Sequence, residues 1–123
     1  MPRIAVVEDN PDNRLLLQAI LGGRFEVLEY DNGEDALVGF AAQRPDVVLL
    51  DISLPGMDGL EILSRVRADA ALARLRVIAL TAHAMAGDRE KYLAAGFDDY
   101  LTKPIIDETL LVKAIEMQLT ANG

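Results

Sequence analysis

The sequence predicts a doubly wound α/β fold, in which helices cover both faces of a five-stranded parallel sheet. Three observations lead to this class. Short aliphatic runs recur along the chain without polar alternation, which is typical of strands buried on both faces. An amphipathic segment of helical length follows each run. No linker, repeat or low-complexity stretch interrupts the alternation, so we expect one domain over residues 1–123.

The composition argues against several classes of protein. The formal net charge of −8 disfavours sequence-independent binding of nucleic acid, whose phosphates require clusters of Lys and Arg. The lack of cysteine excludes disulfides and a thiol nucleophile. No apolar run approaches the roughly 20 residues that cross a bilayer, and residues 1–3 lead into a strand without a signal-peptide pattern. We therefore expect a cytoplasmic protein that binds neither nucleic acid nor membranes.

Each expected strand ends at a charged, hydroxyl or turn residue. The first is a buried run that ends in acid, the third passes from aliphatic residues into Asp51, and the fourth ends at Thr81. The second alternates apolar residues with Glu26 and Glu29, which suits a half-exposed strand nearer an edge. The fifth is short and precedes Lys103. The expected strands are residues 3–9, 25–30, 46–51, 76–81 and 98–101.

Each expected helix begins at a capping residue or ends at glycine or proline. Asn10 before Pro11 marks the start of the first helix, and Asp58 offers a capping box for the third. The fourth is weaker because Gly87 interrupts it. Including their caps, the expected helices are residues 10–21, 31–44, 58–69, 85–95 and 107–119. The core-facing side chains expected on the first and last helices are Leu16, Leu17, Ile20, Leu21, Leu110, Leu111, Ala114, Ile115 and Leu119.

Right-handed crossovers between these elements favour the strand order 2-1-3-4-5 of flavodoxin-like (βα)5 folds, with a crevice between the first and third strands. The first strand ends in Glu8 and Asp9, and the third ends in Asp51. A carboxylate inside a buried strand would be costly, so Asp51 is expected at the open carboxyl end. The sequence therefore places these carboxylates around one crevice.

Carboxylates this close repel one another by several kcal/mol, so the cluster either raises a pKa or takes up a cation. Oxygen ligands without Cys or His suit Mg²⁺. The alternative is that Glu8, Asp9 and Asp51 are separate solvated loop acids or helix caps, which is the commoner role for any one of them alone.

Two further strand ends supply groups that complement an anion. The hydroxyl of Thr81 can donate a hydrogen bond, and Lys103 can act as a counter-ion and phosphate ligand. The Lys103–Pro104 bond can adopt the cis form at a cost of about 0.5–1 kcal/mol, which would aim the ammonium inward. A carboxylate nucleophile, a metal cradle, a hydroxyl and a cation together fit acyl-phosphate chemistry, in which Asp51 attacks a phosphoryl group in line.

These residues lie in four motifs that resemble those of the receiver domains of two-component response regulators, over essentially the whole chain. The motifs are Val-Val-Glu8-Asp9-Asn10, Leu-Leu-Asp51-Ile-Ser-Leu-Pro55-Gly-Met-Asp-Gly59, Leu-Thr81-Ala82 and Tyr100-Leu-Thr-Lys103-Pro104. Each motif is modest alone, but the ordered set is highly specific, and the intervals between Asp51, Thr81 and Lys103 also match the family. The resemblance implies a phosphorelay signalling switch rather than an enzyme.

The resemblance implies a role for each of these residues. Asp51 would accept a phosphoryl group from a phosphohistidine on a histidine kinase or histidine phosphotransfer protein. Thr81 and Lys103 would bind the phosphoryl oxygens, and the small Ala82 would leave access to the site. The implied Mg²⁺ ligands are Glu8, Asp9, Asp51 and the backbone carbonyl of Ser53.

The resemblance also implies how the signal leaves the site. Tyr100 matches the family's switch aromatic, which turns inward as the threonine shifts toward the phosphoryl group; without the resemblance, a half-buried packing aromatic is the simpler interpretation. The surface of the fourth helix, fifth strand and fifth helix then changes its affinity for a downstream protein. Ser53 and His83 lie where family members vary and where phosphoryl lifetime is tuned, although a lone loop histidine is more often an exposed bystander.

Three alternatives stay open from the sequence. An aspartate-nucleophile phosphatase of the haloacid-dehalogenase type needs a second Asp two residues after the nucleophile, where this chain has Ser53. A flavin or nucleotide binder would carry a glycine-rich or hydroxyl-rich loop after the first strand, where residues 8–12 are acidic. A degenerate receiver would act as an unphosphorylated protein-interaction module, against which the complete set of site residues argues.

Two features bear on the protein that carries this domain. The Met1 start and the missing linkers favour a stand-alone regulator over a domain excised from a hybrid kinase or a larger regulator. Residues 82–89 resemble the receivers of hybrid kinases and single-domain cell-cycle regulators more than those of transcription factors.

Overall fold

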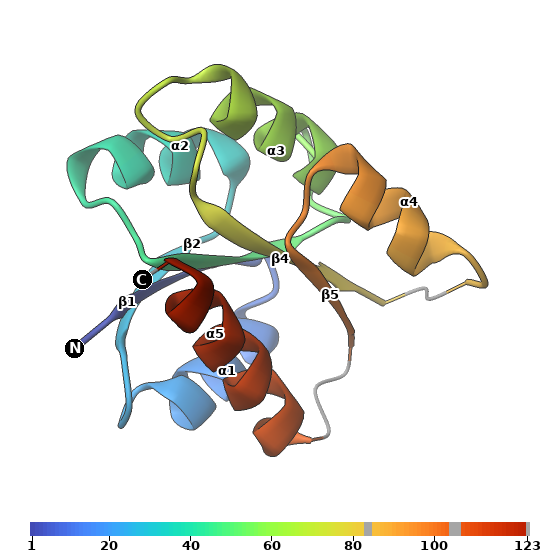
Figure 1. Ribbon diagram of the computed structural model, residues 1–123. Coiled ribbons are helices and arrows are strands. Elements are labelled where there is room, and N and C mark those ends of the chain that lie inside the picture. Colours follow the sequence, from blue (N-terminus) through green and yellow to red (C-terminus); the bar gives the residue numbers. More distant parts are fainter. Residues whose placement is uncertain (83–84, 104–106, 123) are drawn as a thin grey trace.

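A computed structural model describes residues 1–82, 85–103 and 107–122, and strands and helices alternate throughout this part of the chain (Figure 1). The strands are β1 (Arg3–Val7), β2 (Glu26–Tyr30), β3 (Val47–Asp51), β4 (Arg76–Thr81) and β5 (Asp99–Thr102). The helices are α1 (Pro11–Leu21), α2 (Gly33–Ala42), α3 (Gly59–Ala68), α4 (Asp88–Ala95) and α5 (Glu108–Asn122). None of these helices is long and apolar enough to cross a membrane.

The strands form one parallel sheet in the order β2-β1-β3-β4-β5, which confirms the predicted topology. Figure 1 shows α1 and α5 on one face of the sheet and α2, α3 and α4 on the other. Each face carries its own apolar core, one packed under α1 and α5 and the other under α2, α3 and α4. Because β1 and β3 are neighbours, their carboxyl ends meet at one edge of the sheet.

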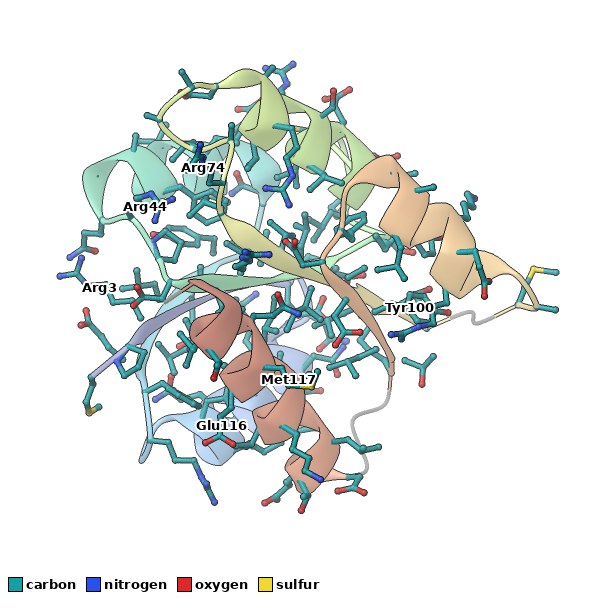
Figure 2. The ribbon with its side chains drawn as sticks, in the orientation of Figure 1. Arg3, Arg44, Arg74, Tyr100, Glu116 and Met117 are labelled. Carbon is teal, nitrogen blue, oxygen red and sulfur yellow. The ribbon has the colours of Figure 1, made fainter. Side chains whose placement is uncertain are left out.

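The burial of each strand follows its sequence pattern. All five residues of β3 are buried, as expected for a continuous aliphatic run in a central strand. β2 lies at an edge and is only half-buried, as its alternating pattern predicts. The side chains of Figure 2 fill the space between the sheet and both helix layers. β3 therefore lies at the centre of the sheet, with its side chains packed into the cores on both faces.

Several predicted boundaries and faces are wrong in detail. α4 begins at Asp88 rather than at residue 85, because Gly87 adopts a left-handed conformation with φ of 87°. β1 ends at Val7, so the acids that follow it lie in the loop before α1. Leu16 is 42% exposed and Leu110 is 59% exposed, so neither faces the core as predicted.

Gly39→Ala is expected to lower the free energy of unfolding by about 1–3 kcal/mol, because α2 packs closely on β2. A Cβ at residue 39 would overlap the ring and hydroxyl of Tyr30. That ring packs edge-on against Phe40, with centroids 5.7 Å apart, so it has little room to move. Urea unfolding followed by circular dichroism measures the change. Gly23→Ala is the control, since a Cβ there meets nothing within 4 Å, and equal stabilities of the two variants would contradict the close packing.

Candidate functional site

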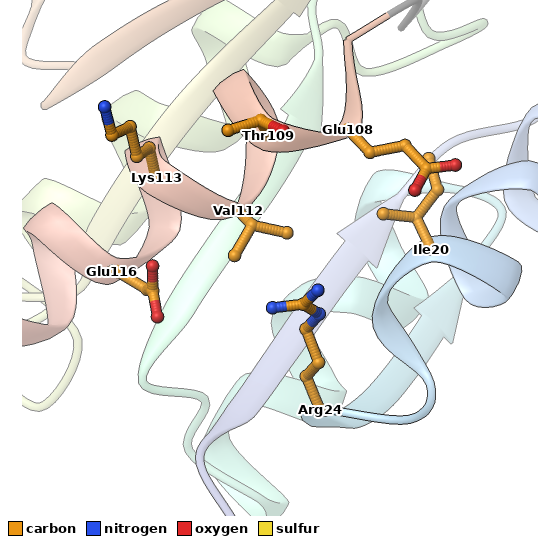
Figure 3. A pocket seen from close by; sticks show the side chains of 7 residues that line it. All are labelled: Ile20, Arg24, Glu108, Thr109, Val112, Lys113 and Glu116. Atoms are coloured by element: carbon orange, nitrogen blue, oxygen red, sulfur yellow. The ribbon is translucent and has the colours of Figure 1, made fainter.

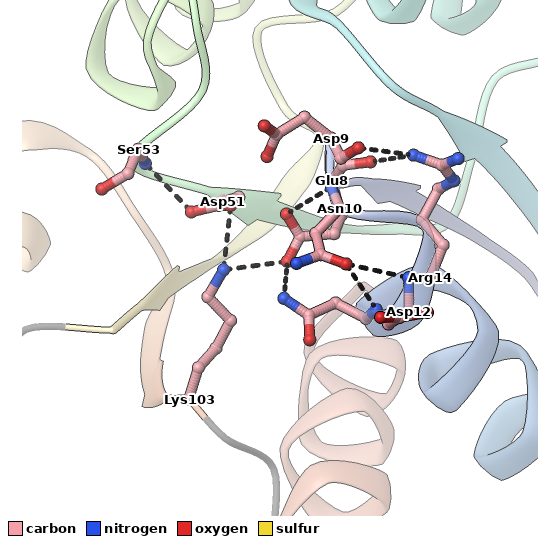
Figure 4. Close-up of polar contacts among 9 residues, drawn as sticks. Glu8, Asp9, Asn10, Asp12, Arg14, Asp51, Ser53 and Lys103 are labelled. Carbon is pink, nitrogen blue, oxygen red and sulfur yellow. Dashed lines mark hydrogen bonds and ion pairs between the residues drawn. The ribbon is translucent and has the colours of Figure 1, made fainter.

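One lysine is shared by two buried carboxylates at the carboxyl edge of the sheet (Figure 4). The Nζ atom of Lys103 lies 2.8 Å from Oε1 of Glu8 and 2.9 Å from Oδ2 of Asp51. Glu8 is 0% exposed and Asp51 is 2% exposed. The backbone N–H of Lys103 donates to the carbonyl of Thr81 over 2.7 Å, just past the end of the β4–β5 ladder. This bond holds the lysine backbone where its side chain reaches both acids.

Asp51 is fixed on its other side by the turn that follows β3. Its Oδ1 accepts the backbone N–H of Ser53 over 2.9 Å. The start of α3 then packs against the end of β3, and the N–H of Gly59 donates to the carbonyl of Ile52 over 3.0 Å. A Cβ at residue 59 would lie 2.7 Å from the carbonyl oxygen of Asp51. Only glycine therefore allows this approach, which fixes the Asp51 backbone.

Glu8 is held by the loop before α1 as well as by the lysine. The side-chain amide of Asn13 donates to Oε1 of Glu8 over 2.9 Å, and the N–H of Asn10 lies 3.4 Å from Oε2. The side chain of Asn10 also caps α1 by accepting the backbone N–H of Asp12 over 2.8 Å. The predicted cap is therefore confirmed, and α1 positions a donor toward the acid.

The three predicted acids converge. Carboxylate oxygens of Glu8, Asp9 and Asp51 all lie within 4.8 Å of one another, and Asp9 is exposed to solvent. Hard oxygen donors at this spacing, open to solvent on one side, suit Mg²⁺, which keeps several of its waters in protein sites. The residues present therefore fit the cation that the sequence predicts.

The buried charges shift one another's pKa. Burial and the adjacent Asp51 raise the pKa of Glu8, and Lys103 opposes them. Burial alone would raise the pKa of Asp51, but its contacts with Glu8, Lys103 and the Ser53 N–H together lower that pKa. Burial alone would lower the pKa of Lys103, but the two carboxylates raise it. At neutral pH, Asp51 is thus an ionised carboxylate beside an ionised lysine.

The other predicted site residues fall into two groups. Thr81 is buried at the end of β4, whereas Ser53 and Ala82 are exposed beside the acids and the threonine. Tyr100 lies in β5 (labelled in Figure 2). Its ring stacks on that of Tyr92 of α4, with centroids 5.6 Å apart. Its hydroxyl is buried and has no hydrogen-bond partner within residues 1–82, 85–103 and 107–122. The predicted residues His83 and Pro104 lie outside the described residues.

Two residues that touch the site are absent from the sequence prediction. Asn13 donates to Glu8, and Arg14 donates to the carbonyls of Glu8 and Asp9. Both lie in the first turn of α1, where polar side chains are ordinary. The only available signal is their position three and four residues after Asn10, which brings them onto the same side of the helix as the cap.

A separate hollow of about 300 Å³ lies between α1 and α5 (Figure 3). Its lining combines two apolar side chains with charges of both signs. The residues are Ile20, Arg24, Glu108, Thr109, Val112, Lys113 and Glu116. None of them belongs to the acidic cluster, so the hollow is distinct from the Asp51 site.

The fold and the site together define a doubly wound α/β domain with an acidic, lysine-paired carboxylate at its topological switch point. The family model of the response regulator receiver domain matches residues 4–116 of this chain, so the chain belongs to that family. It is a receiver domain of two-component systems, a phosphorelay signalling switch. The family, fold class and sheet order predicted from the sequence are confirmed.

Relatives of two architectures match this chain. It is 42% identical over 113 residues to the sensor histidine kinase GacS of Pseudomonas protegens. This match covers 89% of the present chain but only 12% of the kinase. The chain thus spans about an eighth of the length of such kinases. It is 38% identical over 107 residues to the polar-differentiation response regulator DivK of Brucella anthropi, covering 85% of this chain and 87% of DivK.

Solved structures agree with the fold. The receiver domain of a sensor histidine kinase from Pseudomonas aeruginosa, described with a magnesium ion coordinated in its active-site cleft, has 36% sequence identity and a TM-score of 0.87. The match covers 97% of this chain and 98% of that one. A response regulator from Chloroflexus aurantiacus has 30% identity and a TM-score of 0.89, covering 98% and 99% of the two chains.

Proposed function

We propose that Asp51 is the phosphoryl acceptor of this domain and that residues 1–123 form one receiver domain. The observation that carries the proposal is the Lys103 bridge, which pairs a buried, ionised Asp51 with a cation beside an acidic cluster. An Asp51 oxygen attacks the phosphorus of a phosphohistidine; the P–N bond breaks, and its electron pair stays on the imidazole nitrogen. The lowered pKa of Asp51 keeps this oxygen ionised at neutral pH, so that its charge is available for the attack.

The residues around Asp51 bind the incoming group. Lys103 and Thr81 donate to the phosphoryl oxygens, and Ala82 leaves the entrance open. Mg²⁺, when bound, neutralises charge that develops on the transferred group. Two observations support this cation: the convergence of the three acids, and the magnesium described in the related Pseudomonas aeruginosa domain. Its ligands would be Glu8, Asp9, Asp51 and the backbone carbonyl of Ser53.

The phosphoryl group adds negative charge at Asp51 and biases two conformations of the domain. Tyr100 is suited to report this change. Its hydroxyl is buried and has no hydrogen-bond partner among the described residues, which costs free energy. A shift of the ring that gives the hydroxyl a partner would remove this cost. The face of α4, β5 and α5 then binds a downstream protein differently. His83 would tune phosphoryl lifetime, and Pro104 would orient the Lys103 segment.

The partners follow from this chemistry. The donor is a histidine kinase or a histidine phosphotransfer protein, and the target is a protein rather than nucleic acid or a membrane, in keeping with the net charge of −8. The domain works in the cytoplasm as a signal transducer that assists its own phosphotransfer and autodephosphorylation. It is not an enzyme that acts on a separate substrate.

Asp51→Asn is expected to abolish covalent phosphorylation, because the amide lacks the anionic nucleophile. Incubation with acetyl phosphate and Mg²⁺, followed by intact-protein mass spectrometry, should show one added phosphoryl group on the unaltered chain and none on the variant. Asp12→Asn, which changes an exposed acid in the first turn of α1, should leave the mass gain intact. An unmodified wild-type chain would instead favour an unphosphorylated interaction module, and a modified Asp51→Asn variant would refute this acceptor.

A further inference from the structure

The chain between β1 and α1 has two carbonyls that neither element satisfies. The N–H of Glu8 donates to the carbonyl of Tyr30 over 3.0 Å, just past the last residues of the β1–β2 ladder. Beyond this bond the chain turns toward the start of α1, with the carbonyls of Glu8 and Asp9 lying in the turn. The strand no longer pairs them and the helix has not yet begun, so a side chain or water has to supply their hydrogen bonds.

Arg14 supplies both of these hydrogen bonds (Figure 4). Its Nη1 atom lies 2.7 Å from the carbonyl oxygen of Glu8 and 3.1 Å from that of Asp9. One guanidinium nitrogen therefore bridges the two consecutive peptide groups whose side chains enter the acidic cluster. The guanidinium is planar and presents its N–H donors in a fixed fork, which suits a bridge between two neighbouring carbonyls.

Arg14 is itself anchored on two elements. Its backbone N–H donates to the carbonyl of Asn10 over 3.1 Å, within the first turn of α1. Its Nε lies 3.7 Å from a carboxylate oxygen of Glu29 on β2, and its side chain is partly buried. The acidic loop is thus tied through one side chain to the helix that follows it and to the edge strand beside it.

We propose that Arg14 is a positioning residue for the cation site, and that it acts through the backbone of Glu8 and Asp9 rather than through its charge. This inference rests on the proposed Mg²⁺ site. A guanidinium cannot ligate a cation, and its positive charge alone would weaken cation binding. Its contribution to the site is to hold two adjacent acids at converging angles, as groups that orient metal ligands generally do.

The two possible effects of Arg14 have opposite signs, which makes the inference testable. If Arg14 positions the acids, Arg14→Met should weaken Mg²⁺ binding by about tenfold, the usual effect of removing a group that orients a metal ligand. If Arg14 acts through its charge, the same substitution should tighten binding. Arg14→Lys keeps the charge but loses the planar fork, so positioning predicts weaker binding in this variant too.

Isothermal titration of the whole chain with Mg²⁺ alone measures these affinities without any phosphotransfer. Arg24→Met is the matched control: it removes the same charge from an exposed residue just after α1 that lines the separate hollow, and its affinity should stay within about twofold of wild type. Circular dichroism establishes the temperature range in which every variant is folded, and all titrations are compared within it.

Each result decides a different claim. Weaker binding in both Arg14 variants, with Arg24→Met unchanged, supports positioning. Unchanged or tighter binding in Arg14→Met, or wild-type affinity in Arg14→Lys, overturns it while the proposed metal site stands. If Arg14→Met does not fold, Arg14→Lys decides alone by the same criterion. A wild-type chain that binds no Mg²⁺ overturns the proposed cation site and this inference together, before any variant is compared.

Discussion

Replacing Lys103 with methionine is expected to lower the free energy of unfolding at pH 7 by about 3–5 kcal/mol, the usual result of removing one partner from a buried ion pair. The ammonium of Lys103 lies within 3 Å of an oxygen of Glu8 and of Asp51, both of which are almost wholly buried. Methionine keeps the aliphatic stem of the side chain but leaves these two acids facing each other without a counter-ion. The same variant should bind a phosphoryl group poorly, because it lacks the main cationic donor.

The pH dependence of this loss has a definite sign. In the wild type the pKa of Asp51 is lowered, so its stabilising contribution is present above its unfolded pKa and is lost as pH falls through the folded value. The pKa of Lys103 is raised, so its contribution is present below its unfolded pKa and disappears only at alkaline pH. Without Lys103, both carboxylates are costly when ionised, and acid should neutralise them. The difference between variant and wild type should therefore shrink from pH 7 toward pH 5.

Urea unfolding of both proteins at pH 7 and pH 5 measures this difference directly. Lys113→Met is the control, because Lys113 is an exposed lysine on α5 and its removal should change stability by less than about 0.5 kcal/mol. Added Mg²⁺ should stabilise Lys103→Met more than wild type, since the cation replaces the missing charge. Two results would contradict the role of Lys103 as counter-ion. One is a variant as stable as wild type at pH 7, and the other is a difference in stability between variant and wild type that grows from pH 7 to pH 5.

The parts of the site that the sequence predicted are those that follow from the ends of strands. The aliphatic residues of β3 require burial, and the cost of a buried carboxylate places Asp51 at the open end of that strand. The alternation of right-handed strand–helix units brings the end of β1 beside it. Lys103 was predicted as the counter-ion because it follows the fifth strand, whose end lies at the same edge of the sheet as the acids. These inferences need only topology, which periodicity determines well.

The features that the sequence did not predict are the exposure of particular side chains and the contacts that side chains of one element make with another element. Leu16 and Leu110 fit an apolar helical stripe, but both are exposed to solvent, because a folded domain leaves many apolar side chains on its surface. Asn13 and Arg14 look like ordinary polar residues in a first helical turn, and their partners emerge only when the loop before α1 folds back on them. The sequence pattern also does not show that Lys103 lies as close to Glu8 as to Asp51, because this depends on how far its side chain reaches.

Arg67, on α3, makes a further set of contacts that the sequence does not indicate. Its Nη1 donates to the carbonyls of Ala73 and Leu75, in the connection that leads to β4. Its Nη2 lies 2.7 Å from the carbonyl oxygen of Gly96 and 3.0 Å from Oδ2 of Asp98, between α4 and β5. One guanidinium thus joins two chain connections that are distant in sequence.

Asp98 depends on this cation and completes the network. Its Oδ2 also accepts the backbone N–H of Val77 over 2.8 Å, and its Oδ1 lies 3.3 Å from Nη1 of Arg76. Loss of Arg67 would remove the side-chain donor from three carbonyls in a partly buried region, and would remove one of the donors to Oδ2 of Asp98. Each such group costs roughly 1–3 kcal/mol when fully buried, and access to water reduces this cost here.

Arg67→Met is therefore expected to lower the free energy of unfolding by about 2–4 kcal/mol, measured by urea unfolding. Arg67→Lys should lose most of the same amount, because one ammonium cannot reach groups that the planar fork contacts on both sides. Arg65→Met is the control on the same helix: Arg65 is 59% exposed and contacts only Glu61 among its charged neighbours in the described residues, at 3.8 Å, so its loss should cost less than about 0.5 kcal/mol. Wild-type stability of Arg67→Lys would show that charge alone matters. Because Gly96 ends α4, amide exchange in Arg67→Met should rise first where α4 passes into β5, on the face that we propose the downstream protein binds.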